Sequence, residues 1–394
     1  MVRNSSQNNL DFNNTESAYG YLSDKQLNAA IKLFKMFNYP ALVKYGPAFA
    51  GFSMKIGLPV KGLIKNTIFA HFCGGESIID SKSKINFLYN HNVKTILDYA
   101  VEGEANEAVF DATCAEVIRT VEESAVNDAI PFAVFKPTGV ARFALLQKVS
   151  AGEKLTQNEQ DEFEKVRARF DAICKKGSEL NVQVLIDAEH SWIQLAIDNL
   201  VLEMSEKYNK DRALIFNTLQ LYRHDRVQFL KDCFEKYTFP LAFKFVRGAY
   251  MEIERERAAQ MNYPSPINAD KQSTDRDFDE AVSICLHNID RCEVLIGTHN
   301  EESCLKAARL MAELKIASND KRVYFSQLLG MSDNISFIMA KAGYNVAKYV
   351  PYGPVATVLP YLSRRAQENS SIAGQSSRQL QLLVGEKNRR KKRQ

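Results

Sequence analysis

The sequence contains no apolar run long enough to cross a bilayer, which requires about 18 to 20 residues. Its most apolar N-terminal stretch, residues 47–73, is interrupted by Lys55, Lys61, Lys65 and His71. The first twenty residues lack the apolar core of a signal peptide, and with one arginine and two acidic residues they do not resemble a transit peptide. We therefore expect a chain that is neither exported nor membrane-spanning.

Several catalytic signatures are also missing. The sequence has no HExxH, no GxxxxGK[ST] loop, no GxSxG elbow and no paired metal-ligand spacing, so it gives no support to metal-dependent hydrolysis, NTP hydrolysis or serine-hydrolase chemistry. We expect no metal site. The cysteines form no CxxC pair, and their odd number is typical of reduced, buried thiols in an intracellular protein. They are Cys73, Cys114, Cys174, Cys233, Cys285, Cys292 and Cys304.

The chain has little excess of charge of either sign, with 51 basic and 47 acidic side chains. Six of the basic residues lie in the last eight positions, KNRRKKRQ, which leaves the rest of the chain at a net charge of −2. The small positive net charge of the chain therefore comes from its C-terminal tail and gives no reason to expect nucleic-acid binding. With 45% apolar and 25% charged residues, the composition excludes a collagen-like or wholly disordered chain.

From residue 93 onward, short runs rich in β-branched and aromatic residues alternate with stretches whose apolar residues recur at helical spacing. Eight such alternations predict an α/β fold, a (β/α)8 barrel of the TIM type. A doubly wound open sheet fits less well because no GxGxxG follows the first run. The predicted strand regions are 93–101, 131–139, 182–189, 213–222, 241–250, 293–300, 323–331 and 345–353.

Three segments of different character follow one another along the chain. Residues 1–90 predict an N-terminal α-helical arm, residues 91–372 the barrel, and residues 373–394 a short helix followed by a charge run that we expect to be disordered. Within the barrel, residues 151–162 predict a loop that enters a helix with Thr156 as its N-cap.

Polar residues gather at the predicted carboxyl ends of the strands, where such barrels place their reacting groups. Any one of them alone is more often a salt-bridged surface group, but seven strands that end in donors or ionisable groups together indicate a site. Lys136 and Lys244 would also suit a Schiff-base lyase, which stays open as an alternative. The set comprises Lys136, Asp187, Glu189, Gln220, Tyr222, Lys244, Arg247, Tyr250, Thr298, His299, Gln327, Tyr349 and Tyr352.

The eighth helix, predicted from about Pro354, carries the sharpest local pattern. Tyr361, Arg364, Arg365 and Glu368 stand at i, i+3, i+4 and i+7 and therefore share one face. This face is either a solvated surface with an Arg364 to Glu368 ion pair, or a clamp for a carboxylate, because adjacent guanidiniums favour an anion between them. Helix spacing alone leaves both interpretations open.

At these residues the sequence resembles a known family. The strings LIDAE (185–189), LIFNTLQLY (214–222), KFVRGAY (244–250), SQLLGM (326–331) and LPYLSRRAQENSS (359–371) are similar to those of FAD-dependent proline dehydrogenases, in the monofunctional form with mitochondrial-type motifs. The resemblance runs from near residue 10 to Ser371. It implies a distorted barrel whose eighth helix lies over the barrel mouth, oxidation of L-proline to 1-pyrroline-5-carboxylate, and transfer of electrons to a membrane quinone.

The resemblance also implies residue roles. Lys136, Arg364 and Arg365 would bind the proline carboxylate, Glu368 would orient the guanidiniums, and Tyr250, Tyr349 and Tyr361 would surround the pyrrolidine ring. Asp187 corresponds to the family's catalytic aspartate, either as a base or as a holder of neighbouring cations, and Lys244 would lie near the reactive edge of the flavin. The flavin would contact Ala188, Gln220, Arg247, Gly248, Ala249, Thr298, His299 and Gln327.

The sequence departs from the mitochondrial pattern at two points. It lacks a long insertion around the second strand, and Ala356 stands where the family has a glutamate in the loop after the eighth strand, which puts the anchoring of that loop in doubt. Two competing functions remain: a hydroxyproline dehydrogenase of the same family, or an idle barrel that binds anionic surfaces through KNRRKKRQ. We expect a cytoplasmic protein that contacts the inner membrane peripherally and hands its product to a pyrroline-5-carboxylate dehydrogenase.

Overall fold

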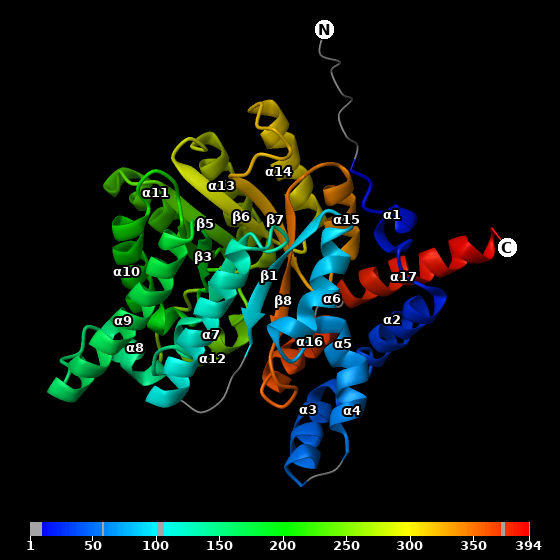
Figure 1. Ribbon diagram of the computed structural model, residues 1–394, viewed down its shortest axis with the longest axis horizontal. Coiled ribbons are helices and arrows are strands. Elements are labelled where there is room, and N and C mark those ends of the chain that lie inside the picture. Colours follow the sequence, from blue (N-terminus) through cyan, green and yellow to red (C-terminus); the bar gives the residue numbers. More distant parts are fainter. Residues whose placement is uncertain (1–9, 57–58, 101–105, 372–374, 394) are drawn as a thin grey trace. The chain divides into compact units, whose positions relative to one another are not determined.

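A computed structural model describes residues 10–56, 59–100, 106–371 and 375–393 of the chain. Its eight strands form a closed barrel in sequence order (Figure 1), which confirms the predicted (β/α)8 fold. Residue 101, the end of the first predicted strand, lies outside the described residues. The strands are β1 (Val93–Tyr99), β2 (Phe132–Phe135), β3 (Gln183–Ile186), β4 (Ile215–Gln220), β5 (Leu241–Val246), β6 (Cys292–Gly297), β7 (Val323–Leu328) and β8 (Val346–Tyr352).

Neighbouring strands pair in parallel, for example through Phe132 with Gln183 and Leu241 with Cys292. Every residue of β2, β3, β4 and β8 is buried. A parallel strand with helices on one side and barrel side chains on the other is buried on both faces. Strand β2 is accordingly apolar throughout, whereas β4 and β8 also bury polar residues such as Asn217, Gln220 and Lys348.

The chain divides into two compact units. The first unit comprises Met1–Thr95, Ala100–Gly103 and Gln327–Gln394, and the second comprises Ile96–Tyr99 and Glu104–Ser326. The predicted arm therefore falls in the same unit as β8 and the last helices, and the boundaries at residues 90 and 372 stay a prediction.

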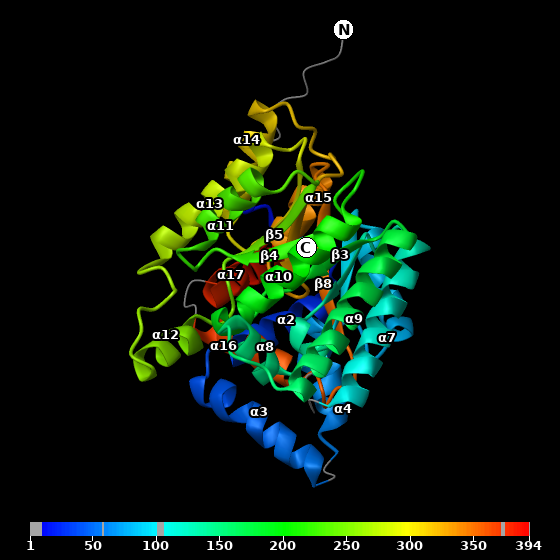
Figure 2. The ribbon, with the colours of Figure 1, turned by 90° about the vertical axis from the view of Figure 1, so that its left-hand side faces the viewer.

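In the second unit, α7 and α9 lie side by side (Figure 2). Thr156 begins α9 with a capping box, in which its Oγ1 accepts from the backbone N–H of Glu159 at 3.3 Å, as the sequence predicts. The helices of this unit are α7 (Glu107–Ala125), the 3-10 helix η2 (Pro137–Gly139), α8 (Phe143–Ser150), α9 (Gln157–Glu179), α10 (Ser191–Tyr208), α11 (Arg226–Lys236), α12 (Met251–Gln260), α13 (Lys271–His287) and α14 (Glu301–Glu313).

In the first unit, helices from the two ends of the chain pack together, and Figure 1 shows α17 in red beside α1 and α2 in blue. The helices of this unit are α1 (Thr15–Tyr19), α2 (Asp24–Met36), α3 (Pro40–Lys55), α4 (Lys61–Ile64), the π-helical turn η1 (Lys65–Phe69), α5 (Ala70–Phe72), α6 (Ile78–Tyr89), α15 (Asp333–Lys341), α16 (Leu359–Ser371) and α17 (Gln375–Lys391).

The C-terminal charge run is not disordered, so that prediction was wrong. Helix α17 continues to Lys391, and Arg389 and Arg390 both pair with the buried Glu386, at 2.7 and 2.8 Å. Arg390 also reaches Asp24, and Arg393 reaches Glu16, at 2.8 and 2.9 Å. Carboxylates from the N-terminal helices therefore stabilise the helical form of the run and engage three of its six positive charges.

All seven cysteines are buried free thiols, as predicted. Within the described ranges, none of the helices combines the length and the apolar character that a bilayer-spanning segment requires.

Candidate functional site

An ion pair connects two strand ends of the second unit. Lys244, on β5 and only 4% exposed, places its Nζ 2.5 Å from Oδ1 of Asp187, which directly follows β3. Strand β4 lies between β3 and β5, so the pair spans this strand. The nitrogen of Lys244 is thus engaged by a carboxylate, and this geometry disfavours the Schiff-base interpretation of the residue.

A second ion pair lies at the neighbouring strands. Lys136, which follows β2, reaches Asp98 Oδ2 on β1 at 3.3 Å. Burial raises the pKa of Asp98, while Lys136 acts in the opposite direction. Asp98 was not predicted, since a single acidic residue inside an apolar strand gives no signal of its partner 38 residues further on.

Glu189 ties three strand ends together in the same unit. Its carboxylate accepts from the N–H and the hydroxyl of Thr138, both at 2.8 Å, and its carbonyl accepts from Nε2 of Gln220 at 2.6 Å. Burial is the main cause of the raised pKa of Glu189. This residue therefore holds the polypeptide after β2 and the Gln220 side chain in fixed positions.

Arg247, after β5, is held by side chains that lie far from it in sequence. It donates to Asp275 at 2.7 Å, to Thr298 Oγ1 at 2.6 Å and to Ser303 Oγ at 2.9 Å, and its guanidinium lies over the ring of Phe278. A guanidinium has five N–H donors, so two remain beyond these three bonds. Periodicity indicated Arg247 and Thr298, but it gave no sign of Asp275, Phe278 or Ser303, which lie on α13 and α14.

The backbone after Arg247 requires a glycine. Gly248 has a φ of 129°, and a Cβ there would lie 2.5 Å from the ring of Tyr222. Ala249 is exposed and Ala188 is half-buried. The ring of Tyr222 therefore packs directly against the backbone of Gly248, a contact that a side chain at this position would prevent.

Tyr250 and His299, two further residues of the predicted set, follow the neighbouring strands β5 and β6. Tyr250, at the start of α12, stacks on His190 with ring centroids 4.2 Å apart. His299 is half-buried and follows Thr298, whose Oγ1 accepts from the N–H of Asn300 at 3.1 Å.

The first unit holds the remaining residues of the predicted set. Gln327, on β7, is buried and accepts from the hydroxyl of Ser336 on α15 at 2.7 Å. Tyr349, on β8, is also buried, and its carbonyl accepts from the N–H of Leu329. Both side chains are therefore fixed by packing within this unit.

Helix α16 carries the arginine stripe. Arg365 pairs with Glu368, and its guanidinium centre lies 5.2 Å from the ring centroid of Tyr361. The residue is 7% exposed and Tyr361 is 5% exposed, so this part of the face is not solvated. The partner of Glu368 is thus Arg365 at i,i+3, whereas the solvated interpretation expected Arg364. Burial raises the pKa of Glu368, while Arg365 and Arg364 oppose this effect.

The loop after β8, which lacks the family's glutamate at Ala356, is held by another residue of the first unit. The carboxylate of Glu76 accepts from the N–H of Val355 at 3.4 Å and pairs with Lys65 and Lys61 at 2.5 and 3.0 Å. The hydrogen bond from Lys65 is the main reason why the pKa of Glu76 is lowered to about 2. Glu76 was not predicted, because it lies some 280 residues before the loop.

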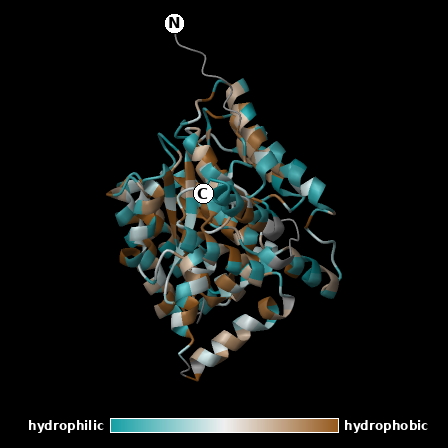
Figure 3. Cartoon of the chain, turned by 90° about the vertical axis from the view of Figure 1, so that its right-hand side faces the viewer, coloured by the Kyte–Doolittle hydropathy of each residue, from teal (hydrophilic) through white to brown (hydrophobic). Residues whose placement is uncertain are grey.

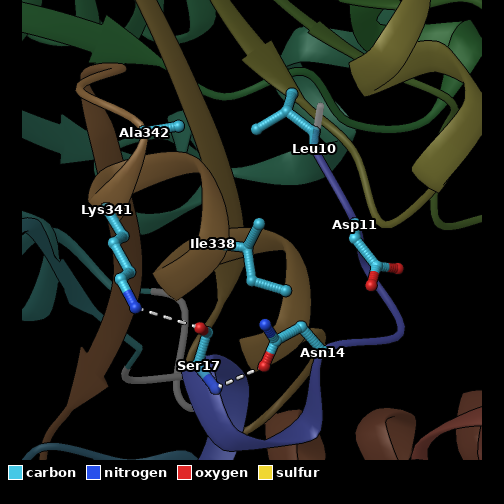
Figure 4. Close-up of a pocket in the computed structure, with 7 residues that line it drawn as sticks. All are labelled: Leu10, Asp11, Asn14, Ser17, Ile338, Lys341 and Ala342. Carbon is cyan, nitrogen blue, oxygen red and sulfur yellow. Dashed lines mark hydrogen bonds between the residues drawn. The ribbon is translucent and has the colours of Figure 1, made fainter. Parts of the chain in front are cut away.

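A separate pocket of the first unit is shown in Figure 4. There Lys341 Nζ donates to Ser17 Oγ at 3.2 Å and the Ser17 N–H donates to Asn14 Oδ1 at 2.9 Å. The predicted site residues do not line it. Its lining is Leu10, Asp11, Asn14, Ser17, Ile338, Lys341 and Ala342.

Comparisons with known proteins agree on one family. The family model described as proline dehydrogenase matches residues 81–378. The carbapenem antibiotics biosynthesis protein CarD of Pectobacterium carotovorum subsp. carotovorum is 34% identical over 333 residues, which cover 84% of this chain and 86% of that protein. The human mitochondrial proline dehydrogenase 1 is 42% identical over 244 residues, which cover 58% of this chain and 39% of the relative.

Solved structures agree in fold. The proline utilization A protein of Bdellovibrio bacteriovorus inactivated by N-propargylglycine superposes with a TM-score of 0.69 at 22% identity, over 79% of this chain and 34% of that chain. At this identity the likeness concerns the fold. The present chain thus spans about a third of the length of that protein and about two fifths of the human relative.

Proposed function

Because the chain belongs to the proline dehydrogenase family and is an oxidoreductase that acts on proline, we propose that it oxidises L-proline to 1-pyrroline-5-carboxylate with FAD as the hydride acceptor and a quinone as the final oxidant. The observation that carries this proposal is the arginine stripe of α16. Two adjacent guanidiniums, one of them buried against Tyr361 and Glu368, are suited to bind a planar carboxylate.

In this proposal Arg364, Arg365 and Lys136 bind the substrate carboxylate, and Glu368 keeps Arg365 in position. Tyr250, Tyr349 and Tyr361 contact the pyrrolidine ring. Holding the carboxylate and the ring in place sets the direction of the C–H bond next to the nitrogen. Orientation of this kind can lower the activation free energy of a reaction by about 7 kcal/mol in favourable cases.

The donors of the second unit fit a cofactor that is anionic and rich in hydrogen-bond acceptors. Among the described residues, three of the five N–H groups of Arg247 bind protein, which leaves two that could donate to such a cofactor. We propose that Ala188, Gln220, Arg247, Gly248, Ala249, Thr298, His299 and Gln327 hold FAD. When bound, FAD would supply the acceptor for the hydride.

Asp187 and Lys244 act as a pair in this account. The 2.5 Å contact fixes the side chain of Lys244 on β5, and we propose that Asp187 positions this group. The ring carbon next to nitrogen loses a hydride and the nitrogen loses a proton, so the C–N single bond becomes the C=N bond of the product. The product is labile, and a separate dehydrogenase of pyrroline-5-carboxylate would be its natural recipient.

The first test is the cofactor itself. We expect the purified protein to contain FAD that is released on denaturation, since in this proposal the residues named above hold it through non-covalent contacts. The measurement is the flavin spectrum of the supernatant after acid or heat precipitation. A colourless protein that does not take up added FAD, or a flavin retained by the precipitate, would contradict the proposal and favour an idle barrel.

Substrate choice depends on Tyr349. Its phenol would close the pocket against a ring hydroxyl, so we expect kcat/KM to be higher for L-proline than for trans-4-hydroxy-L-proline. The ratio should narrow about tenfold or more in Tyr349→Ser, because removing an aromatic ring opens space for the hydroxyl. Tyr344→Ser, just before β8 at its other end, is the matched control and should leave the ratio unchanged. A wild type that prefers hydroxyproline would assign the chain to the alternative branch.

A further inference from the structure

Helix α3 carries an apolar stripe on its outer face. Large apolar residues follow one another at intervals of three, four, three and four, which places them on one side of the helix. Each is between 46% and 68% exposed. Together with the preceding Tyr39 they form what we call the α3 patch: Tyr39, Leu42, Tyr45, Phe49, Phe52 and Ile56.

Other residues of α3 belong to the protein interior. Val43 and Ser53 are buried, and α3 packs against α16, the helix that carries the arginine stripe, within the same unit. In Figure 3, pale and brown colours predominate along this helix at the lower end of the view, whereas teal and brown alternate along many other helices. The helix is therefore anchored by its buried residues and exposes its apolar stripe. Exposed patches of this size on a single element mark an interaction surface.

Lysines predominate in the sequence on both sides of the patch. Residues 25–60 contain five lysines and neither an arginine nor an acidic residue, although the whole chain has a net charge of only +4, whereas Lys61 and Lys65 further on pair with Glu76. Lys44 lies within the patch region, with its ammonium 5.4 Å from the centroid of the Tyr45 ring. Apolar and aromatic side chains beside lysines are the composition of a helix that lies in the interface of an anionic bilayer.

We propose that the α3 patch is embedded in one leaflet of an anionic lipid bilayer, with α3 parallel to the membrane surface. At 16 residues, or about 24 Å, the helix is shorter than a bilayer-spanning segment. The proposed membrane contact is inferred from the patch and its lysines alone. Its purpose, which would be to bring the α16 clamp near a lipid-dissolved quinone, rests on the proposed function. The expected contact through the C-terminal tail is less favoured, because three of its charges are engaged by Glu16, Asp24 and Glu386.

The test is co-sedimentation of the full-length, cofactor-loaded protein with vesicles of phosphatidylglycerol and phosphatidylcholine. We expect Phe49→Ser/Phe52→Ser to weaken binding at least tenfold, and Lys44→Gln to weaken it further only at low salt. The matched control is Val126→Ser, which removes an apolar side chain that is 83% exposed in the second unit. Lys391→Gln/Lys392→Gln tests the tail. Both controls should bind like the wild type.

Two further measurements keep the interpretation unambiguous. Turnover with a water-soluble dye acceptor should be unchanged in Phe49→Ser/Phe52→Ser, so a failure of the proposed function would leave the binding result intact. Equal vesicle binding by this variant and the wild type would overturn the proposal. A second result would also overturn it: a wild type that is dimeric in solution and does not bind vesicles, together with a Phe49→Ser/Phe52→Ser variant that is monomeric. A second copy of the chain would then be what covers the patch.

Discussion

Replacing Arg365 with methionine is expected to lower kcat/KM for L-proline by about 10- to 150-fold, the loss that corresponds to one charge-assisted hydrogen bond of ~1.5–3 kcal/mol. Arg364→Met should show a loss of the same order. The bound FAD per chain should stay constant, because the flavin residues are separate from those of α16. Steady-state kinetics together with a flavin determination measure both quantities.

The control for the clamp is Arg309→Met, which removes an exposed arginine from α14 and should leave kcat/KM unchanged. Glu368→Gln should have a smaller effect than either arginine variant, since it removes a positioning partner and not a ligand of the carboxylate. If KM and kcat/KM of Arg364→Met and Arg365→Met match those of the wild type, the clamp does not exist.

Replacing Lys348 with methionine is expected to lower the free energy of unfolding by about 3–5 kcal/mol, the typical effect of removing one partner of a buried ion pair. Lys348 is fully buried on β8, and its Nζ lies 2.8 Å from Asp333 Oδ1 and donates to the carbonyl groups of Leu328 and Met331. Tyr21 donates to the other carboxylate oxygen at 2.6 Å. Without Lys348 the Asp333 charge would be buried and only partly compensated.

Urea unfolding of the purified protein measures this loss. Lys341→Met, on the exposed side of α15, is the control and should change the free energy of unfolding by less than about 0.5 kcal/mol. The double variant Asp333→Asn/Lys348→Met should be more stable than Lys348→Met alone, because no unpaired charge remains. A Lys348→Met variant as stable as the wild type would contradict the pairing.

The same pair predicts a pH dependence. Burial acts to raise the pKa of Asp333, but Lys348 and Tyr21 lower it overall. An aspartate whose pKa is lowered in the folded state stabilises that state above its unfolded value of about 3.9 and loses this contribution as the pH falls through the folded value. The stability difference between the wild type and Asp333→Asn/Lys348→Met should therefore shrink below about pH 4, in urea titrations repeated across pH.

The eight strands could be predicted because each is rich in β-branched and aromatic residues and is separated from the next by apolar residues at helical spacing. The strand-end residues followed from the same reasoning, since all parallel strands end at the same edge of the sheet. Thr156 was predictable because a capping box is encoded within four residues. Local patterns therefore fixed the fold and the positions of candidate residues.

The partners of these residues could not be predicted. The partners of Asp98, Asp275 and Glu76 lie 38, 28 and 279 residues away along the chain. At such sequence separations the spacing of residues gives no signal that two side chains will meet. The charge run near Arg390 was predicted to be disordered, and no local sign in the sequence indicated its partners Glu16 and Asp24, because they lie at the other end of the chain. The α3 patch was not predicted either, because residue spacing alone does not show which face of a helix stays exposed.

The central claim is that this chain transfers a hydride from L-proline to bound FAD. It is tested most directly by mixing the purified, flavin-containing protein with L-proline in the absence of oxygen and following the absorbance of the oxidised flavin. We predict that the absorbance bleaches and that 1-pyrroline-5-carboxylate forms in equal amount to the reduced flavin, whereas D-proline leaves the spectrum unchanged. A flavin that stays oxidised with saturating L-proline would contradict the account.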